Sequence, residues 1–198
     1  MTAPVEMIKK EHELAAISQA VKLAILSGLA DGTGIAQAVS ATVARELAGV
    51  IGVSVPSSAR MTIVTASIAS AAINGVLQSG CELAPATQGL LVPILRGTRL
   101  HGSEVLAAAM RASKIVTRAV AEGKCDLEAA VTGLIRGAIQ SANEIGVDAA
   151  DAATAAATGA LNAVGDVRSS AYQTVLAAVT KPFDGIMISP KEPTVSSN

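Results

Sequence analysis

The sequence predicts an all-α fold, a bundle or array of about seven to eight short antiparallel helices followed by an irregular C-terminal tail. Three observations support this fold class. Apolar residues recur at helical spacing, for example Val105, Leu106, Ala109 and Met110. A glycine followed closely by an acidic residue recurs about every 22 residues, and one stretch of the chain is repeated in the next.

The repeat is a two-helix unit at an offset of 44 residues, which aligns residues 81–122 with residues 125–166. Alanine identities count for little, since the chain has 40 alanines. The pairs that define the repeat join cysteine, glycine, leucine or acidic residues: Cys81 with Cys125, Leu83 with Leu127, Gly89 with Gly133, Leu90 with Leu134, Gly102 with Gly146, and Glu104 with Asp148.

Each recurring glycine predicts a turn between two helices. Gly80, Gly102, Gly123 and Gly146 can adopt the left-handed conformation that ends a helix, and the acid or serine that follows can cap the next one. Helices of ~16 residues, about 24 Å long, fit between these turns. Pro93 falls inside an apolar pattern and predicts a kink or a helix break.

Three helices are predicted before the repeats, at about Val5–Leu29, at about Ile35–Ile51, and from Ser57 or Ser58 to about Gln78. The domain organisation follows from these limits. Residues 1–58 form N-terminal helices loosely related to the repeats, residues 59–180 form the repeat region and pack with them as one domain, and residues 181–198 form a tail.

Composition indicates how the helices pack and excludes one class of function. The chain of 198 residues is 51% hydrophobic and only 16% charged, so it buries most of itself. With one Tyr, one Phe and no Trp, small residues line the helix contacts, and the spacing of Gly133 and Gly137 predicts close approach of two helices. The lack of aromatic stacking groups and a net charge of -1 exclude general nucleic-acid binding.

The 21 residues from Met61 to Cys81 are all uncharged and reach the ~20 needed to cross a bilayer. Their content of Ser, Thr, Asn and Gln, and the absence of aromatic anchors at either end, favour a buried core helix instead. The N-terminus shows no signal sequence and two cysteines make no disulfide framework. We therefore expect a cytoplasmic protein, or one peripheral to a membrane.

Cys81 and Cys125 are the candidate redox or packing pair. Each precedes an acidic residue at a predicted helix start, where a thiolate would be stabilised, and an up-down array would bring both to one end. The interpretation we favour makes both small buried hydrophobic residues at a repeated packing position. No Cys-x-x-Cys spacing supports a zinc site.

Other chemical groups carry weaker signals. His12, between Glu11 and Glu13, is expected on a solvated face, and His101 is expected in an exposed turn or as a cap. Residues 32–34, Gly-Thr-Gly, lack the third glycine of the dinucleotide fingerprint. The sequence therefore predicts no catalytic residue, cofactor site or metal site.

Charge is unevenly distributed along the chain. Residues 96–118 have a balance of +4, while residues 122–166 have a balance of -5. The cations of the first segment are Arg96, Arg99, Arg111, Lys114 and Arg118. The last three share one helical face, which could meet an anionic membrane or an acidic partner. We favour a solvated face, or one paired with the acidic repeat or a second copy of the chain.

These features favour a non-catalytic structural or adaptor protein that acts through its surface as an oligomer, bound to a protein partner or to itself. The alternative is a peripheral protein that coats an anionic membrane or a hydrophobic granule with amphipathic helices. An 11-residue period, half of 22, would favour that alternative through long unbroken helices, but the glycines favour turns. An enzyme of unrecognised type, with no identified small-molecule substrate, is the third hypothesis.

Overall fold

The computed structural model describes residues 3–30, 34–51, 58–97, 103–165, 169–183 and 185–190. These residues contain eight helices: α1 (Ala3–Ala30), α2 (Ile35–Ile51), α3 (Ser58–Ser79), α4 (Leu83–Gly97), α5 (Ser103–Glu122), α6 (Leu127–Ile145), α7 (Ala149–Val164) and α8 (Ser170–Val179). The only β pairing among them is an isolated bridge between Phe183 and Ile186. The all-α prediction is confirmed.

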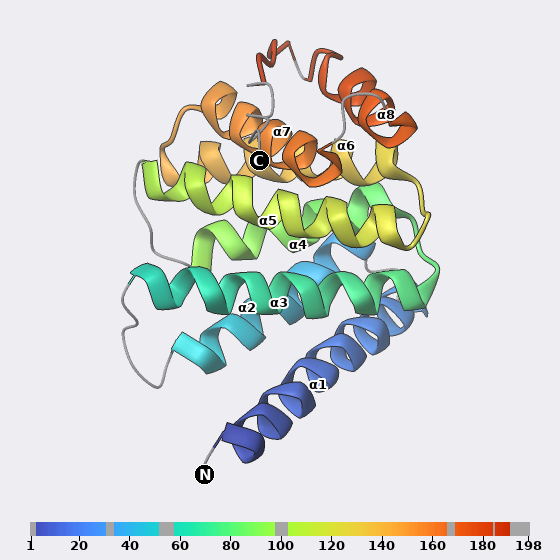
Figure 1. Cartoon of the computed structure of the whole chain (residues 1–198), viewed down its shortest axis with the longest axis vertical. Coiled ribbons are helices and arrows are strands. Elements are labelled where there is room, and N and C mark those ends of the chain that lie inside the picture. The colour runs from blue at the N-terminus through green and yellow to red at the C-terminus, as the bar shows by residue number, and fades with distance from the viewer. Residues whose placement is uncertain are drawn as a thin grey trace.

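The helices form two layers (Figure 1). The odd layer contains α1, α3, α5 and α7, and the even layer contains α2, α4 and α6, with α8 packed on α6 and α7 at one end. Consecutive helices run in opposite directions, so the helices within one layer run the same way (Figure 1). The molecule is therefore a stack of helix pairs in which each helix packs against the one two places along the chain.

The sequence repeat coincides with two successive helix pairs, α4–α5 and α6–α7. Equivalent helices pack directly on each other, α4 on α6 and α5 on α7. A methyl group placed on Gly133 of α6 would lie 2.0 Å from the carbonyl oxygen of Ala84, and one on Gly159 of α7 would lie 2.0 Å from that of Met110. Each contact joins residues 49 positions apart in the sequence. Helix α6 therefore lies on α4 in the same register as α7 lies on α5.

The same kind of contact recurs earlier in the stack. A methyl group on Gly75 of α3 would lie 2.3 Å from the carbonyl oxygen of Ser18 in α1, and one on Gly89 of α4 would lie 2.1 Å from that of Ala36 in α2. Heavy atoms cannot approach this closely, so only glycine fits at these positions. The predicted close approach at Gly133 is thus one case of a device that brings helix backbones together in both layers.

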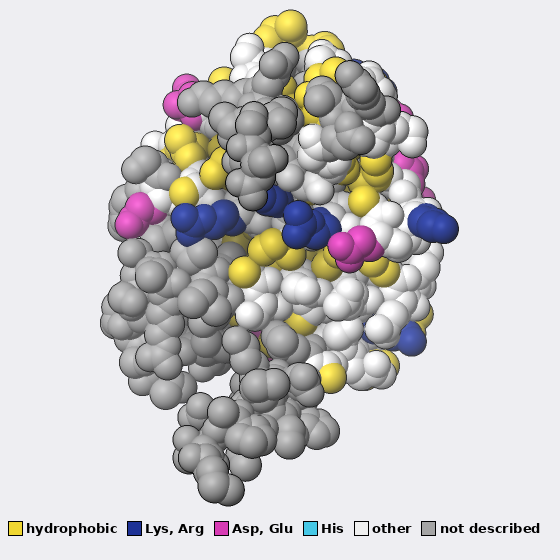
Figure 2. Space-filling model, in the orientation of Figure 1, with side chains coloured by type: hydrophobic (Ala, Val, Ile, Leu, Met, Phe, Trp, Pro, Cys, Tyr) yellow, Lys and Arg dark blue, Asp and Glu magenta, His cyan; other side chains and the backbone are white. Residues whose placement is uncertain are grey.

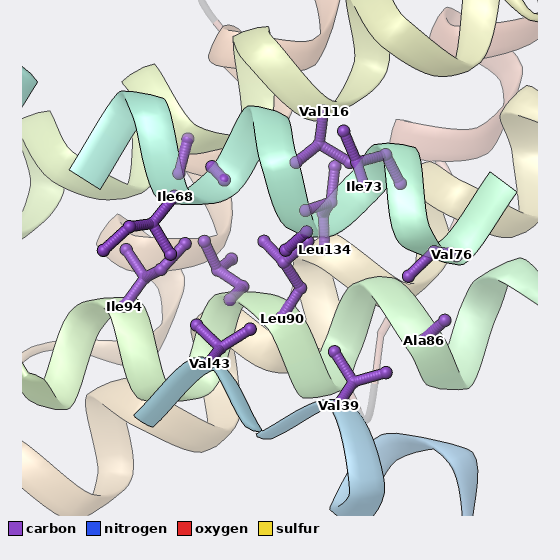
Figure 3. Packing of buried hydrophobic residues seen from close by; sticks show 14 of the residues in the cluster. Val39, Val43, Ile68, Ile73, Val76, Ala86, Leu90, Ile94, Val116 and Leu134 are labelled. Carbon is purple, nitrogen blue, oxygen red and sulfur yellow. The ribbon is translucent and has the colours of Figure 1, made fainter. Parts of the chain in front are cut away.

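A core of aliphatic side chains fills the space between the layers (Figure 3). Val43 of α2, Ile73 of α3, Leu90 of α4, Val116 of α5 and Leu134 of α6 point toward one another there, and all five are buried. Burial of each such side chain contributes roughly 1.5–3 kcal/mol to folding, which makes this core the main source of stability.

One buried hydroxyl links two helices of the even layer. The Oγ1 of Thr87 in α4 lies 2.8 Å from the carbonyl oxygen of Leu83 in its own helix and 2.9 Å from that of Ala130 in α6. Its single proton can be donated to either oxygen. This contact fixes the register of α4 against α6 beside the Gly133 contact.

The turns largely follow the predicted chemistry. Gly80 and Gly146 have φ values of 66° and 74°, in the left-handed region that favours glycine. Between α5 and α6 the prediction was wrong about the residue, because Lys124, with φ 52°, takes this conformation instead of Gly123. Gly102 lies outside the described residues.

Acidic caps begin two of the repeat helices. Asp126 accepts a hydrogen bond from the backbone N–H of Ala129 at 2.9 Å and caps α6. Asp148 accepts one from the N–H of Asp151 at 2.9 Å and caps α7. An acid at the N-cap satisfies a free amide and places negative charge at the positive end of the helix dipole.

Two predictions about the chain path are corrected. Of the kink or break predicted at Pro93, the break does not occur, because α4 continues through Pro93 to Gly97. The predicted tail also packs in part, because Phe183 and Ile188 are buried in a second core cluster with Tyr172 of α8. That cluster lies between α6, α7 and α8, where the short α8 leaves apolar surface that these two residues cover.

The uncharged residues 61–81 fall mostly within α3, where Ile68, Ile73 and Val76 are buried, as predicted for a core helix. Among the helices of the described ranges, none combines the length and the apolar content needed to cross a membrane.

Candidate functional site

A cleft of about 440 Å³ brings the two cysteines together. It lies where the end of α3 meets the starts of α4 and α6, and Cys81 and Cys125 both line it. The two helix starts are neighbours because α4 and α6 are equivalent, parallel helices of the even layer. The stacking of the repeat therefore places two thiols 44 positions apart in the sequence on one surface.

The two thiols differ in environment. Cys81 is half-buried, and its backbone N–H donates to the Ser79 Oγ at 3.4 Å. Cys125 is exposed, and its Sγ donates to the carbonyl oxygen of Gly123 at 3.3 Å. Both are free. The interpretation of both cysteines as buried packing residues is wrong for Cys125, because the turn that contains Lys124 carries it to the surface.

The remaining groups of the cleft are mostly apolar, and its two acids are Glu82 and Asp126. The Asp126 carboxylate is engaged as the α6 cap. Within the described part of the chain, no three His, Cys, Asp or Glu side chains lie close enough together to hold a metal ion. The cleft thus offers two accessible thiols in apolar surroundings.

Four of the five cations of the basic segment lie in the described residues, and they separate into two groups. Arg96 of α4 forms an ion pair with Glu144 of α6, which joins the basic segment to the acidic repeat. Hydrogen bonding to the Arg96 guanidinium lowers the pKa of the Glu144 carboxyl below its ordinary value. Both side chains remain partly exposed, so the pair contributes ~0–1 kcal/mol.

Arg111, Lys114 and Arg118 form the other group, on the outer surface of α5. We call these three residues the basic face. All three are exposed, and Figure 2 shows Lys and Arg side chains in a band across the molecule where α5 lies. No described residue forms an ion pair with Lys114 or Arg118. Arg99 and His101 lie outside the described residues, as does the side chain of His12.

Comparison with known proteins places the chain in no family. No family model, no curated protein and no solved structure matches it.

The sequence analysis missed a second exposed feature, on α1. Leu23 and Leu26 are 55% and 48% exposed, whereas Ile17, Val21 and Ile25 of the same helix are buried. The signal was present in the sequence, because leucines three residues apart lie on the side of the helix away from a buried stripe at 17, 21 and 25. Such a helix has apolar residues on two faces.

Proposed function

We propose that the protein is a non-catalytic structural or adaptor protein that binds an acidic segment of a partner protein through the basic face of α5. The exposure of Arg111, Lys114 and Arg118 in one stripe on a closely packed helix stack is the observation that carries the proposal. A rigid support favours binding because little conformational freedom is lost when the partner docks.

The ion pairs and helix caps formed by the acids of the repeat support this choice of surface. Glu144 pairs with Arg96, and Glu128 of α6 pairs with Lys181 after α8. Asp126 and Asp148 cap helices. Much of the negative charge of the repeat is thus engaged within the molecule, and none of these acids pairs with Lys114 or Arg118 of the basic face.

The charge order along α5 favours a short acidic segment over an extended anionic surface. Glu104 precedes Arg111 by seven residues, and Glu122 follows Arg118 by four, so both acids extend the same stripe. Both are exposed. The three cations span ~10 Å between these acids. A broad anionic membrane would contact the acids as well as the cations, whereas a short peptide can contact the cations alone.

The test measures binding of the full chain to poly-L-glutamate and to phosphatidylglycerol vesicles, at low and high salt. We expect binding to poly-L-glutamate that weakens as salt rises. Replacement of Arg111, Lys114 and Arg118 by Ala removes three exposed pairs of ~0.2–1 kcal/mol each, so the affinity falls about 3- to 150-fold.

A matched variant replaces three exposed cations elsewhere, Arg45, Lys124 and Arg136, by Ala and changes the net charge equally. This control should retain most of the affinity for poly-L-glutamate. Equal loss in both variants, or no binding at low salt, contradicts the proposal. Stronger binding to the vesicles than to poly-L-glutamate, lost in the basic-face variant, would overturn it in favour of a protein that coats anionic membranes.

A further inference from the structure

We infer that a second copy of the chain docks on α1, so that two stacks join at their N-terminal ends. Helix α1 is the end of the odd layer (Figure 1). The interior helices α3 and α5 each have a neighbour on both sides within that layer, whereas α1 packs only on α3 and on α2 of the other layer. One long side of α1 therefore has no helix against it within the described chain.

That side carries a stripe with the spacing of a helix–helix seam. We call it the α1 stripe, and it consists of Ala16, Gln19, Leu23, Leu26 and Ala30. The intervals alternate between three and four residues, as at the a and d positions of a coiled coil. All five side chains are exposed. Leu23 and Leu26 are two of the four large apolar side chains that are exposed in the described residues.

The C-terminal end of the stack exposes different side chains from those of the α1 stripe. Helix α8 closes that end and exposes mostly polar side chains, namely Ser170, Gln173, Thr174 and Thr180, with Ala177 among them; Met187, after α8, is a single exposed large apolar side chain there. Terminal elements of a helical array need such a polar outer surface to stay in water. The leucines of the α1 stripe break this rule at the N-terminal end, which indicates that another apolar surface covers them.

Charge and size together favour a second copy as the occupant. The α1 stripe contains no charged residue, and among residues 15–28 of α1 the only charged side chain is Lys22, which is half-buried. Two such stripes related by a two-fold axis therefore meet without repulsion, and an isologous contact of this kind closes on itself.

The end of the stack is also large enough. Helices α1 and α2, of 28 and 17 residues, measure ~42 and ~26 Å by about 10 Å across, or roughly 680 Å² for each protomer. A stable dimer buries about 800 Å² for each protomer, and a specific interface needs at least about 500 Å². On α2 the exposed Ala41, Ala44 and Ala48 leave room for close approach, and the one long side chain among them is Arg45, which pairs with Glu46.

This inference goes beyond the proposed function and concerns another surface, so either can fail alone. The test measures the mass of the full chain by light scattering and sedimentation equilibrium over a range of concentrations. We expect a dimer for the unaltered chain. Leu23→Glu with Leu26→Glu should raise the dissociation constant at least about 100-fold and yield a monomer of unchanged helix content, because both positions are exposed in the protomer.

Two further variants keep the test independent of folding. Met187→Glu places the same charge at an apolar side chain that is 72% exposed elsewhere, and it should remain a dimer. Gln19→Leu completes the α1 stripe and should tighten the dimer about tenfold. A monomer for the unaltered chain, a dimer for the double variant, or no tightening by Gln19→Leu would each overturn the inference. Poly-L-glutamate binding by a monomeric double variant would leave the proposed function intact.

Discussion

Replacement of Gly133 by Ala tests how the stack is held together. The added methyl group would lie 2.0 Å from the carbonyl oxygen of Ala84 and 2.2 Å from the Thr87 Oγ1. Ordinary contacts of a Cβ begin at about 3.4 Å, so α6 must move away from α4 by more than about 1 Å. The opposing atoms belong mainly to backbone, which cannot rotate aside.

The cost can be worked out from three contributions. Overpacking of a tight contact costs ~1–3 kcal/mol, and loss of the Thr87 contact with Ala130 costs about 1 kcal/mol more. The higher helix propensity of alanine returns about 1 kcal/mol. The free energy of unfolding should therefore fall by roughly 1–3 kcal/mol, and the melting temperature by ~2–12 °C.

Gly49→Ala is the matched control, because Gly49 lies within α2 and nothing lies within 4 Å of its added methyl group. This variant should be more stable by about 0.5–1 kcal/mol. Urea and thermal unfolding followed by circular dichroism measure both changes. If Gly133→Ala is as stable as the unaltered chain, or if the two substitutions shift stability in the same direction, the backbone contact does not hold α4 and α6 together.

Three further predictions concern single interactions. Asp126→Ala should destabilise the fold by about 1 kcal/mol in urea unfolding, whereas Asp126→Asn, which keeps a capping oxygen, should change it little; equal effects would exclude the cap as the cause. Thr87→Val should cost ~1–2 kcal/mol because it breaks a contact between helices, and more than Thr42→Val, whose hydroxyl bonds only within α2. Glu144→Gln should lower stability by up to about 1 kcal/mol at neutral pH. Because pairing lowers the Glu144 pKa in the folded state, the difference is present above the ordinary glutamate pKa of about 4.3 and disappears as pH falls through the lowered value; a difference that persists in acid contradicts the pairing.

Local signals predicted the helices well. The limits of α2 and α3 match the expected 35–51 and 58–78 to within a residue, because serine, glycine and proline mark those boundaries directly in the sequence. The repeat offset predicted that helix pairs recur. Pro93 does not break α4, because tertiary packing holds the helix despite the missing amide, with Val92 and Ile94 buried on either side.

Contacts between helices were harder to predict. Gly133 stood out through its spacing from Gly137, but nothing in the sequence distinguishes Gly159, which meets Met110, from Gly49, which meets nothing. The identity of the opposing atom depends on the stacking register, and no local pattern encodes it. The spacing of the exposed leucines of α1 was visible in the sequence, but only the stack shows that α1 is a terminal helix and that no other helix covers them.

Some features of the candidate sites could also be predicted from the sequence, and others required the contacts between helices. The basic face followed from helical spacing alone, because residues at i, i+3 and i+7 share a side of any helix. The pairing of Arg96 with Glu144 required the contact of α4 with α6. The exposure of Cys125 depended on Lys124, a residue whose left-handed conformation is uncommon outside glycine, asparagine and aspartate.

The distance between spin labels on the native cysteines tests the stacked arrangement most directly. Cys81 and Cys125 are the only two cysteines, and unlabelled protein can dilute the sample so that only pairs within one chain are measured. Parallel neighbours with axes ~8–10 Å apart predict a distance below about 20 Å, including the label arms. A distance beyond about 25 Å, as for antiparallel α4 and α6 helices of 15 and 19 residues, would contradict the stack.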